Sequence, residues 1–271
     1  RNPMKHLLII LSVLLFSFTV ISCKSSTSSS TDNSTTTELY VSVGYSGTIL
    51  TSSDGITWTE RDSGTSEYLR GVTYENGLFV TVGYSGTILT SSDGTTWTQR
   101  TSGISNYLYE VTYGNGLFVS VGWEETILYS PDGTTWTERT SGTSNYLYEV
   151  TYGNGTFVSV GRNGIILTSK DGTTWTPRTS GTVISILGVQ YVNSTFVAVG
   201  RGGLILTSTD GTKWTSRTTY TSTDLYDVTY GNSKFVAVGA SGTSVTSSDG
   251  VIWTATSNIL HQSAFYAITS K

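Results

Sequence analysis

A seven-residue motif, Ser-x-Asp-Gly-x-x-Trp, recurs at one fixed interval and constrains the fold of this chain more than any other feature. Its aspartates are each 39 residues apart: Asp54, Asp93, Asp132, Asp171, Asp210 and Asp249. A constant period of this length, with four strand-like pieces per unit, is typical of β-propeller blades. We therefore predict an all-β fold, a six-bladed β-propeller of four-stranded antiparallel blades over residues 39–271.

The third copy of the repeat shows the four expected strands. Segments 107–113, 117–121, 127–130 and 136–140 are rich in β-branched and aromatic residues, and Gly114-Asn115-Gly116 has the composition of a tight hairpin. Apolar residues occur on both faces of the first two segments, as expected for blades packed between two neighbours.

The motif itself predicts a turn between the third and fourth strands. Asp132 is placed to accept hydrogen bonds from backbone N–H groups, Gly133 to adopt a conformation that side chains resist, and Trp136 to bury its ring beside the hairpin. The repeated tryptophans are accordingly expected in the core: Trp58, Trp97, Trp136, Trp175, Trp214 and Trp253. A full set of calcium ligands is missing, so no metal is expected at the aspartates.

This motif resembles the Asp-box, or BNR, repeat of sialidases and of propellers related to photosystem II assembly factors. It is one residue shorter between aspartate and tryptophan than the usual pattern, and the resemblance covers nearly all of the chain after residue 38. The resemblance implies that the loops between the second and third strands share a face with the crossovers between blades, opposite the motif.

The two ends of the repeat array suggest how the ring closes. The first copy lacks its opening strand, whereas the last residues, AFYAIT at 264–269, match the opening segment of other copies and have no further blade to start. We expect this C-terminal strand to pair with the three N-terminal ones, because closure removes exposed sheet edges.

The N-terminal region reads as a secretory leader followed by a tether. Met4 and Lys5 precede an apolar run over 7–21, and Val-Ile-Ser-Cys at 20–23 resembles the lipobox of bacterial lipoproteins. We predict a signal peptide with lipobox over 1–23, lipidation of Cys23, and a Ser/Thr-rich flexible tether over 24–38. The alternative is an ordinary signal peptide with an incidental cysteine. If the lipobox resemblance holds, the protein is anchored in a bacterial cell envelope, and Lys24 favours the outer membrane or cell surface.

The composition of the chain excludes several classes of function. From residue 39 onward there are 17 acidic and 12 basic side chains, so no basic surface is available to attract nucleic acid. The one cysteine lies outside the repeats, and the two histidines, His6 and His261, are far apart, so no metal site, cofactor site or histidine-based triad is expected. We expect a monomer that meets the membrane only through Cys23.

Positions that break the repeat are the candidates for a binding site. The loop between the second and third strands begins with a different residue in most copies: Tyr45, Tyr84, Trp123, Arg162, Arg201 and Ala240. Trp123 is followed by Glu124 and Glu125, where other copies have small residues. An exposed ring there suits a protein or a sugar. The alternative is that Trp123 covers the neighbouring tip, with a glutamate pairing Arg162. By contrast, five arginines repeat on the outermost strand and are expected to form a solvated rim: Arg61, Arg100, Arg139, Arg178 and Arg217.

A second set of breaks lies near the start of the innermost strands. Glu110, Glu149 and Asp227 replace small residues there, and Arg70 stands next to Gly71. These side chains are expected at the mouth of the central channel. Two carboxylates are the minimum for glycoside hydrolysis, but pairing with Arg70 or with Tyr109, Tyr148 and Tyr226 is the favoured interpretation.

These observations favour a non-catalytic binding or assembly module that holds a protein or glycan on the face of the strand 2–3 loops. The alternative is a sialidase-like glycoside hydrolase. Only Arg70, Arg162 and Arg201 depart from the repeated rim arginines, and no nucleophile and base constellation is visible.

Overall fold

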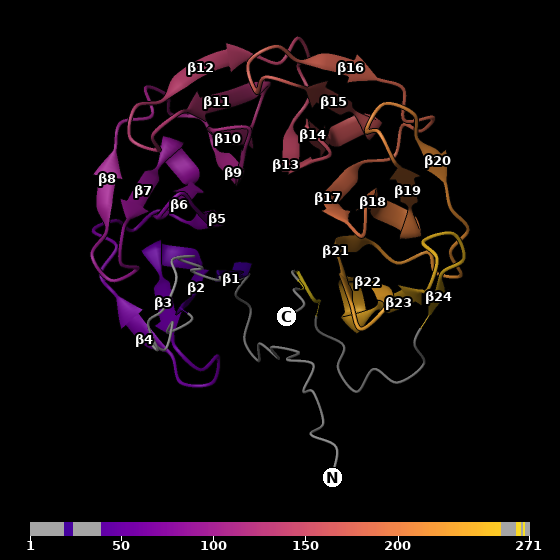
Figure 1. Cartoon of the computed structure of the whole chain (residues 1–271), viewed down its shortest axis with the longest axis horizontal. Coiled ribbons are helices and arrows are strands. Elements are labelled where there is room, and N and C mark those ends of the chain that lie inside the picture. The colour runs from indigo at the N-terminus through magenta and orange to yellow at the C-terminus, as the bar shows by residue number, and fades with distance from the viewer. Residues whose placement is uncertain (1–18, 24–38, 256–263, 267, 269–271) are drawn as a thin grey trace, which may run out of the picture.

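The protein is built from six four-stranded antiparallel sheets arranged around a common centre, as the prediction of a six-bladed β-propeller requires. The computed structural model describes residues 19–23, 39–255, 264–266 and 268. In Figure 1 the first strand of each blade lies nearest the centre and the fourth lies at the periphery. No helix in these ranges is long and apolar enough to span a membrane.

The strands follow one another in each blade from the centre outward. Blades 1 and 2 contain β1 (Thr19–Cys23), β2 (Leu39–Val43), β3 (Ile49–Ser52), β4 (Thr59–Arg61), β5 (Leu69–Glu75), β6 (Leu78–Gly83), β7 (Ile88–Ser91) and β8 (Thr98–Arg100). Blades 3 and 4 contain β9 (Leu108–Gly114), β10 (Leu117–Gly122), β11 (Thr126–Ser130), β12 (Thr137–Thr140), β13 (Leu147–Gly153), β14 (Thr156–Gly161), β15 (Ile166–Ser169) and β16 (Thr176–Arg178). Blades 5 and 6 contain β17 (Ile186–Val192), β18 (Thr195–Gly200), β19 (Ile205–Ser208), β20 (Thr215–Ser216), β21 (Leu225–Gly231), β22 (Lys234–Gly239), β23 (Ser244–Ser247) and β24 (Thr254–Ala255).

The hydrophobic core lies between neighbouring blades. One cluster joins Val80 and Val82 of blade 2 to Val111, Phe118 and Trp136 of blade 3, and each of these side chains is buried. The second strands are apolar on both faces because each face meets a different neighbour. The expectation from the third copy is thus confirmed.

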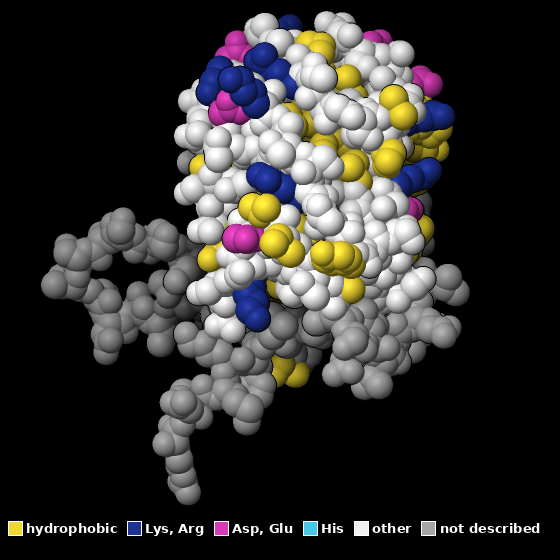
Figure 2. Space-filling view, turned by 90° about the vertical axis from the view of Figure 1, so that its right-hand side faces the viewer, with side chains coloured by type: hydrophobic (Ala, Val, Ile, Leu, Met, Phe, Trp, Pro, Cys, Tyr) yellow, Lys and Arg dark blue, Asp and Glu magenta, His cyan; other side chains and the backbone are white. Residues whose placement is uncertain are grey.

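The outermost strands are short and largely exposed. β20 and β24 have two residues each, and β12, the longest, has four exposed ones. Arg61, Arg100, Arg178 and Arg217 each donate from Nε to a threonine hydroxyl of the adjacent third strand. Figure 2, which faces the side of the molecule where β20 and β24 lie, shows Lys, Arg, Asp and Glu side chains gathered at the upper left and apolar side chains in small groups elsewhere.

The repeated turn is held by two side chains acting together. In blade 3, Ser130 Oγ accepts the N–H of Gly133 at 2.8 Å and donates to Asp132 Oδ1 at 2.9 Å. The same carboxylate oxygen accepts the N–H groups of Thr134 and Thr135, both at 2.8 Å. Gly133 has φ 72°, where a side chain is strained, and Trp136 Nε1 donates to its carbonyl oxygen at 3.0 Å. The roles of the aspartate, glycine and tryptophan were predicted from the sequence, but that of the serine was not.

Replacement of Ser130 by alanine tests that role. It removes the acceptor of the buried Gly133 N–H, which costs about 1–3 kcal/mol when a buried donor is left unpaired. We expect the melting temperature to fall by about 3–8 °C for a domain of this size. Thr135→Ala is the matched control, because it keeps the backbone N–H that Asp132 accepts. Equal melting temperatures for the two variants would contradict the role of the serine.

The inner edge of blade 1 differs from the expectation. β1 (Thr19–Cys23) pairs with β2, with Thr19 opposite Val43 and Cys23 opposite Leu39, so residues of the predicted leader hold the place expected for the C-terminal strand. Thr, Val and Ile favour extended backbone, and an open sheet edge accepts any such segment. The first blade therefore includes residues outside the predicted propeller boundary of 39–271. The C-terminal residues instead contact blade 6, where the Phe265 N–H donates to the Gly239 carbonyl oxygen at 2.9 Å.

Candidate functional site

The loops between the second and third strands form one face of the ring together with the crossovers between blades. Five of them are short 3-10 turns: η1 (Tyr45–Gly47), η2 (Tyr84–Gly86), η3 (Arg162–Gly164), η4 (Arg201–Gly203) and η5 (Ala240–Gly242). The first residue of the loop donates its N–H to the carbonyl just before the inner strand of its own blade, as Tyr84 does to Tyr68 and Trp123 to Tyr107. The repeated Asp turns lie at the other end of the antiparallel strands. The face implied by the family resemblance is thus the one observed.

Six aromatic side chains on this face form a continuous row, which we call the aromatic arc. It consists of Tyr45, Tyr68, Tyr84, Tyr107, Trp123 and Tyr146. Two pairs are stacked at 8° between ring planes, Tyr45 on Tyr68 at 3.9 Å and Tyr84 on Tyr107 at 4.1 Å. The remaining steps along the row are tilted or edge-on, at 4.8–5.2 Å. The arc therefore runs from blade 1 to blade 4 without a break.

Trp123 and Arg162 form the end of the arc. The Trp123 ring lies 4.8 Å from that of Tyr107 and 5.2 Å from that of Tyr146, so it bridges blades 3 and 4. The guanidinium of Arg162 lies 5.2 Å from the centre of the Tyr146 ring, a cation–π contact. Glu124 and Glu125 are exposed and both have positive φ. The structure thus places Trp123 against the neighbouring blade, as one interpretation anticipated, and brings Arg162 to a tyrosine.

The other half of the face is built differently. The positions that carry tyrosine in blades 2, 3 and 4 are occupied by Ser185 and Asp224 in blades 5 and 6. Asp224 accepts the N–H of Gly202 at 2.9 Å, which joins it to the tip that begins with the exposed Arg201. The aromatic arc is therefore confined to one side of the ring.

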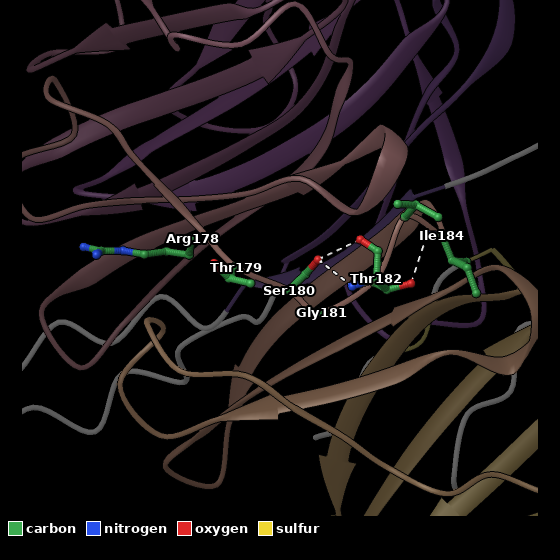
Figure 3. Close-up of a pocket in the computed structure, with 7 residues that line it drawn as sticks. Arg178, Thr179, Ser180, Gly181, Thr182 and Ile184 are labelled. Carbon is green, nitrogen blue, oxygen red and sulfur yellow. Dashed lines mark hydrogen bonds between the residues drawn. The ribbon is translucent and has the colours of Figure 1, made fainter.

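Half of the arc, namely Tyr68, Tyr107 and Tyr146, was not predicted from the sequence. They follow variable crossover residues and look like part of the inner strand, so no break in the repeat drew attention to them. Val183 and Ile184 were not predicted either, and they are 83 % and 44 % exposed in the crossover to blade 5. Figure 3 shows this crossover lining a shallow pocket, with Ser180 and Thr182 hydrogen-bonded to each other and Arg178 pointing away.

The second predicted group, Arg70, Glu110, Glu149 and Asp227, lies on the inner strands. Glu110 Oε1 accepts its neighbour Val111 N–H at 3.0 Å and lies close to Gly71, where a Cβ atom would be 2.9 Å from it. Asp227 accepts the N–H groups of Val228 and Ile268, at 2.7 and 2.8 Å.

Arg70 lies among aromatic rings rather than alone. Its guanidinium is 5.0 Å from the ring centre of Tyr109 and 5.8 Å from that of Tyr68. Arg70 and Arg162 are thus held over rings of different blades, and Arg201 belongs to a third tip. The inner carboxylates accept hydrogen bonds from backbone N–H groups and from Gln190, so their pairing with Arg70 or with the tyrosines stays a prediction.

The inner carboxyl groups are shifted towards their neutral forms. Burial raises the pKa of Glu110 to about 8, against the opposing effects of the Val111 N–H and of Arg70. Burial also raises the pKa of Asp227 to about 7, and burial together with the charge of Glu110 raises that of Glu149. Glu149 Oε1 accepts a long hydrogen bond from Gln190 Nε2 at 3.4 Å. Within the part of the chain that the structure describes, no group of three or more His, Cys, Asp and Glu side chains is arranged to hold a metal ion.

Comparison with known proteins supports the architecture. A family model described as the DUF6242 beta propeller domain matches residues 111–225, which is less than half of the chain. No curated protein sequence matches.

Several solved structures are similar in fold. YCF48 from Cyanidioschyzon merolae has a TM-score of 0.65 at 17% identity, over 84% of this chain and 83% of that one. YCF48 bound to D1 peptide has a TM-score of 0.64 at 18% identity, over 80% and 76% of the two chains. The WD40 beta propeller domain of Doa1 gives 0.65 at 14% identity, over 84% and 81%. The chain is thus a six-bladed β-propeller that resembles the DUF6242 propeller domain over part of its length and YCF48 in overall fold.

Proposed function

We propose that this protein is a non-catalytic binding or assembly module that holds a protein partner against the aromatic arc and the adjoining tips with Arg162 and Arg201. The observation that carries the proposal is the arc itself. In a chain of near-identical repeats, six ring side chains gather on one side of one face, where the opposite side has small and charged residues.

The packing of the arc favours a protein over a glycan. Sugar recognition by stacking needs a free ring face, but stacking between neighbours covers facing surfaces in two pairs of the arc. Rings held rigidly by one another lose little conformational entropy on binding, which is the property that makes tyrosine and tryptophan effective at protein interfaces. The exposed Val183 and Ile184 between the two arginine tips extend the same face with apolar surface.

The comparisons support a protein partner by analogy of fold. One similar propeller, YCF48, is described in complex with a D1 peptide. Since that likeness is at 18% identity, it supports the class of function and not the identity of the partner. We further propose that the domain is attached to a bacterial envelope through Cys23, with residues 24–38 as a spacer.

The test is recovery of partners from envelope extract by the full chain and by a variant with Trp123→Ala and Arg162→Ala. Loss of an aromatic anchor typically costs about 2 kcal/mol or more, or at least a thirtyfold loss of affinity. We expect a specific protein to be retained by the unaltered chain and lost by the variant.

Ile56→Ala is the matched control, because Ile56 is 78 % exposed in an Asp turn at the opposite end of the strands. The control variant should retain the partner. Equal recovery by all three proteins would reject the proposed face, and turnover of a glycoside panel that depends on Glu149 would replace binding with catalysis.

A further inference from the structure

Two segments of this chain can pair with the inner edge of β2. We propose that they occupy it in succession: Thr19–Cys23 before the leader is cut, and the C-terminal residues 264–269 afterwards. The proposal depends on cleavage of the leader before Cys23 and is independent of the partner-binding function.

A hydrogen bond between the second strand and the inner strand repeats in blades 2, 3 and 4. A hydroxyl in the middle of the second strand donates to a carbonyl of the inner strand: Thr81 to Gly71 at 2.8 Å, Ser120 to Glu110 at 2.9 Å and Ser159 to Glu149 at 2.9 Å. Ser42 is the equivalent residue of β2 and is 3 % exposed. Blade 1 therefore carries the hydroxyl that blades 2, 3 and 4 use to hold their inner strands, whereas blades 5 and 6 have Ala198 and Ala237 at this position.

The sequence of the C-terminal segment matches that of the inner strands of other blades. Aligned with β9, Phe265 takes the place of Leu108, Tyr266 that of Tyr109 and Ile268 that of Val111. Because Val111 is opposite Ser120 in blade 3, the same register places Ile268 opposite Ser42. In the structure Val20 is opposite Ser42. The two segments therefore compete for the same backbone groups.

The C-terminal segment lies against blade 6, where the inner strand of a following blade would begin. Its Phe265 N–H donates to Gly239 at 2.9 Å, just as Leu69 of blade 2 donates to Gly44 of blade 1 at 3.0 Å. The ring of Tyr266 stacks on that of Tyr226 at 5.1 Å, and the Ile268 N–H reaches Asp227. The first two contacts have counterparts between other blades, namely the Leu69 N–H to Gly44 and the Tyr109 ring 6.0 Å from that of Tyr148.

Cleavage of the leader before Cys23 would remove most of β1 and so leave its place to the C-terminal segment. Hydrolysis of the Ser22–Cys23 peptide bond consumes one water, leaves a carboxylate on Ser22 and an amine on Cys23, and separates four of the five residues of β1 from the chain. The inner edge of β2 would then hold unpaired N–H and C=O groups, which is unfavourable in a buried position. Pairing with residues 264–269 satisfies these groups.

Disulfide trapping in the full chain tests the exchange. One chain carries Ser42→Cys with Ile268→Cys, and another carries Ser42→Cys with Val20→Cys. Each is produced in a bacterium that processes lipoproteins, with Cys23 intact or with Cys23→Ala, which blocks processing. We expect the first pair to cross-link with Cys23 intact and to lose the cross-link with Cys23→Ala, where the second pair cross-links instead.

A second measurement covers variants that fold poorly. Deletion of residues 264–271 should lower the melting temperature of the processed protein by more than it lowers that of the Cys23→Ala protein, because only the former needs the segment. Equal cross-linking of Ile268→Cys in both forms, equal shifts on deletion, or retention of residues 19–22 in cells would overturn the proposal. None of these readouts involves the binding partner.

Discussion

Replacement of Gly161 by alanine is expected to lower the free energy of unfolding by about 3 kcal/mol or more, at the upper end of the usual cost of inserting a buried methyl group. A Cβ atom on Gly161 would lie 1.9 Å from the carbonyl oxygen of Tyr146, and the same clash, at 1.9–2.4 Å, occurs at Gly83, Gly122, Gly200 and Gly239. The obstacle is backbone that begins the inner strand, so no side chain can turn away. Thermal unfolding should show a decrease of about 6–12 °C.

Gly142→Ala is the matched control for this prediction. Gly142 has φ 73° and nothing within 4 Å of an added Cβ, so its substitution should cost only the strain of a left-handed conformation, about 1–2 kcal/mol. If Gly161→Ala is no more destabilising than Gly142→Ala, the close contact between loop tip and inner strand is not what fixes this face.

The stability of the domain is expected to be greatest near pH 4–5 and to fall on both sides. Above that range the unfolded chain releases protons that the folded chain retains, because burial holds the pKa of Glu110 at about 8 and that of Asp227 at about 7. Below pH 4 the Asp turns lose their stabilising effect as their carboxylates become protonated. The backbone N–H groups of Thr57 and Ile56 lower the pKa of Asp54 to about 2, so the folded state favours the charged form. We expect the free energy of unfolding to fall by on the order of 5 kcal/mol between pH 5 and 8, measured by urea unfolding.

A double variant separates the two effects. Glu110→Gln with Asp227→Asn should remove most of the decline between pH 5 and 8 and leave the decline below pH 4 unchanged. Glu124→Gln, at an exposed tip, should alter neither. The charged and titratable groups around the altered pair are Arg70, Glu149 and Tyr109, so a residual slope in the double variant would be assigned to Glu149. An unchanged slope would contradict the raised pKa values.

The repeat allowed the fold to be predicted in detail, because a period of 39 residues fixes four strands and one turn six times. The strands of the third copy begin within one residue of the predicted positions. The turn was predicted because aspartate, glycine and tryptophan each have one dominant role at such spacing. Trp123 and Arg162 were found because they break the pattern.

Side-chain contacts between neighbouring blades could not be predicted from the sequence. Tyr68 and Tyr107 each stack on a tip from the preceding blade, a neighbour that lies more than twenty residues away in the chain. The occupant of the β2 edge also could not be decided, because β-branched residues at 19–23 and the repeat-like residues at 264–269 both suit an open edge. Competition between segments is a property of the whole chain and not of either sequence alone.

The brevity of the outermost strands affects how many copies can be packed together. A β-sheet polymerises when one molecule offers another a long flat edge, but here each rim presents two to four residues before it ends, and Pro177 lacks an N–H in one of them. Copies of this protein should therefore not join edge to edge through these strands, even at high concentration.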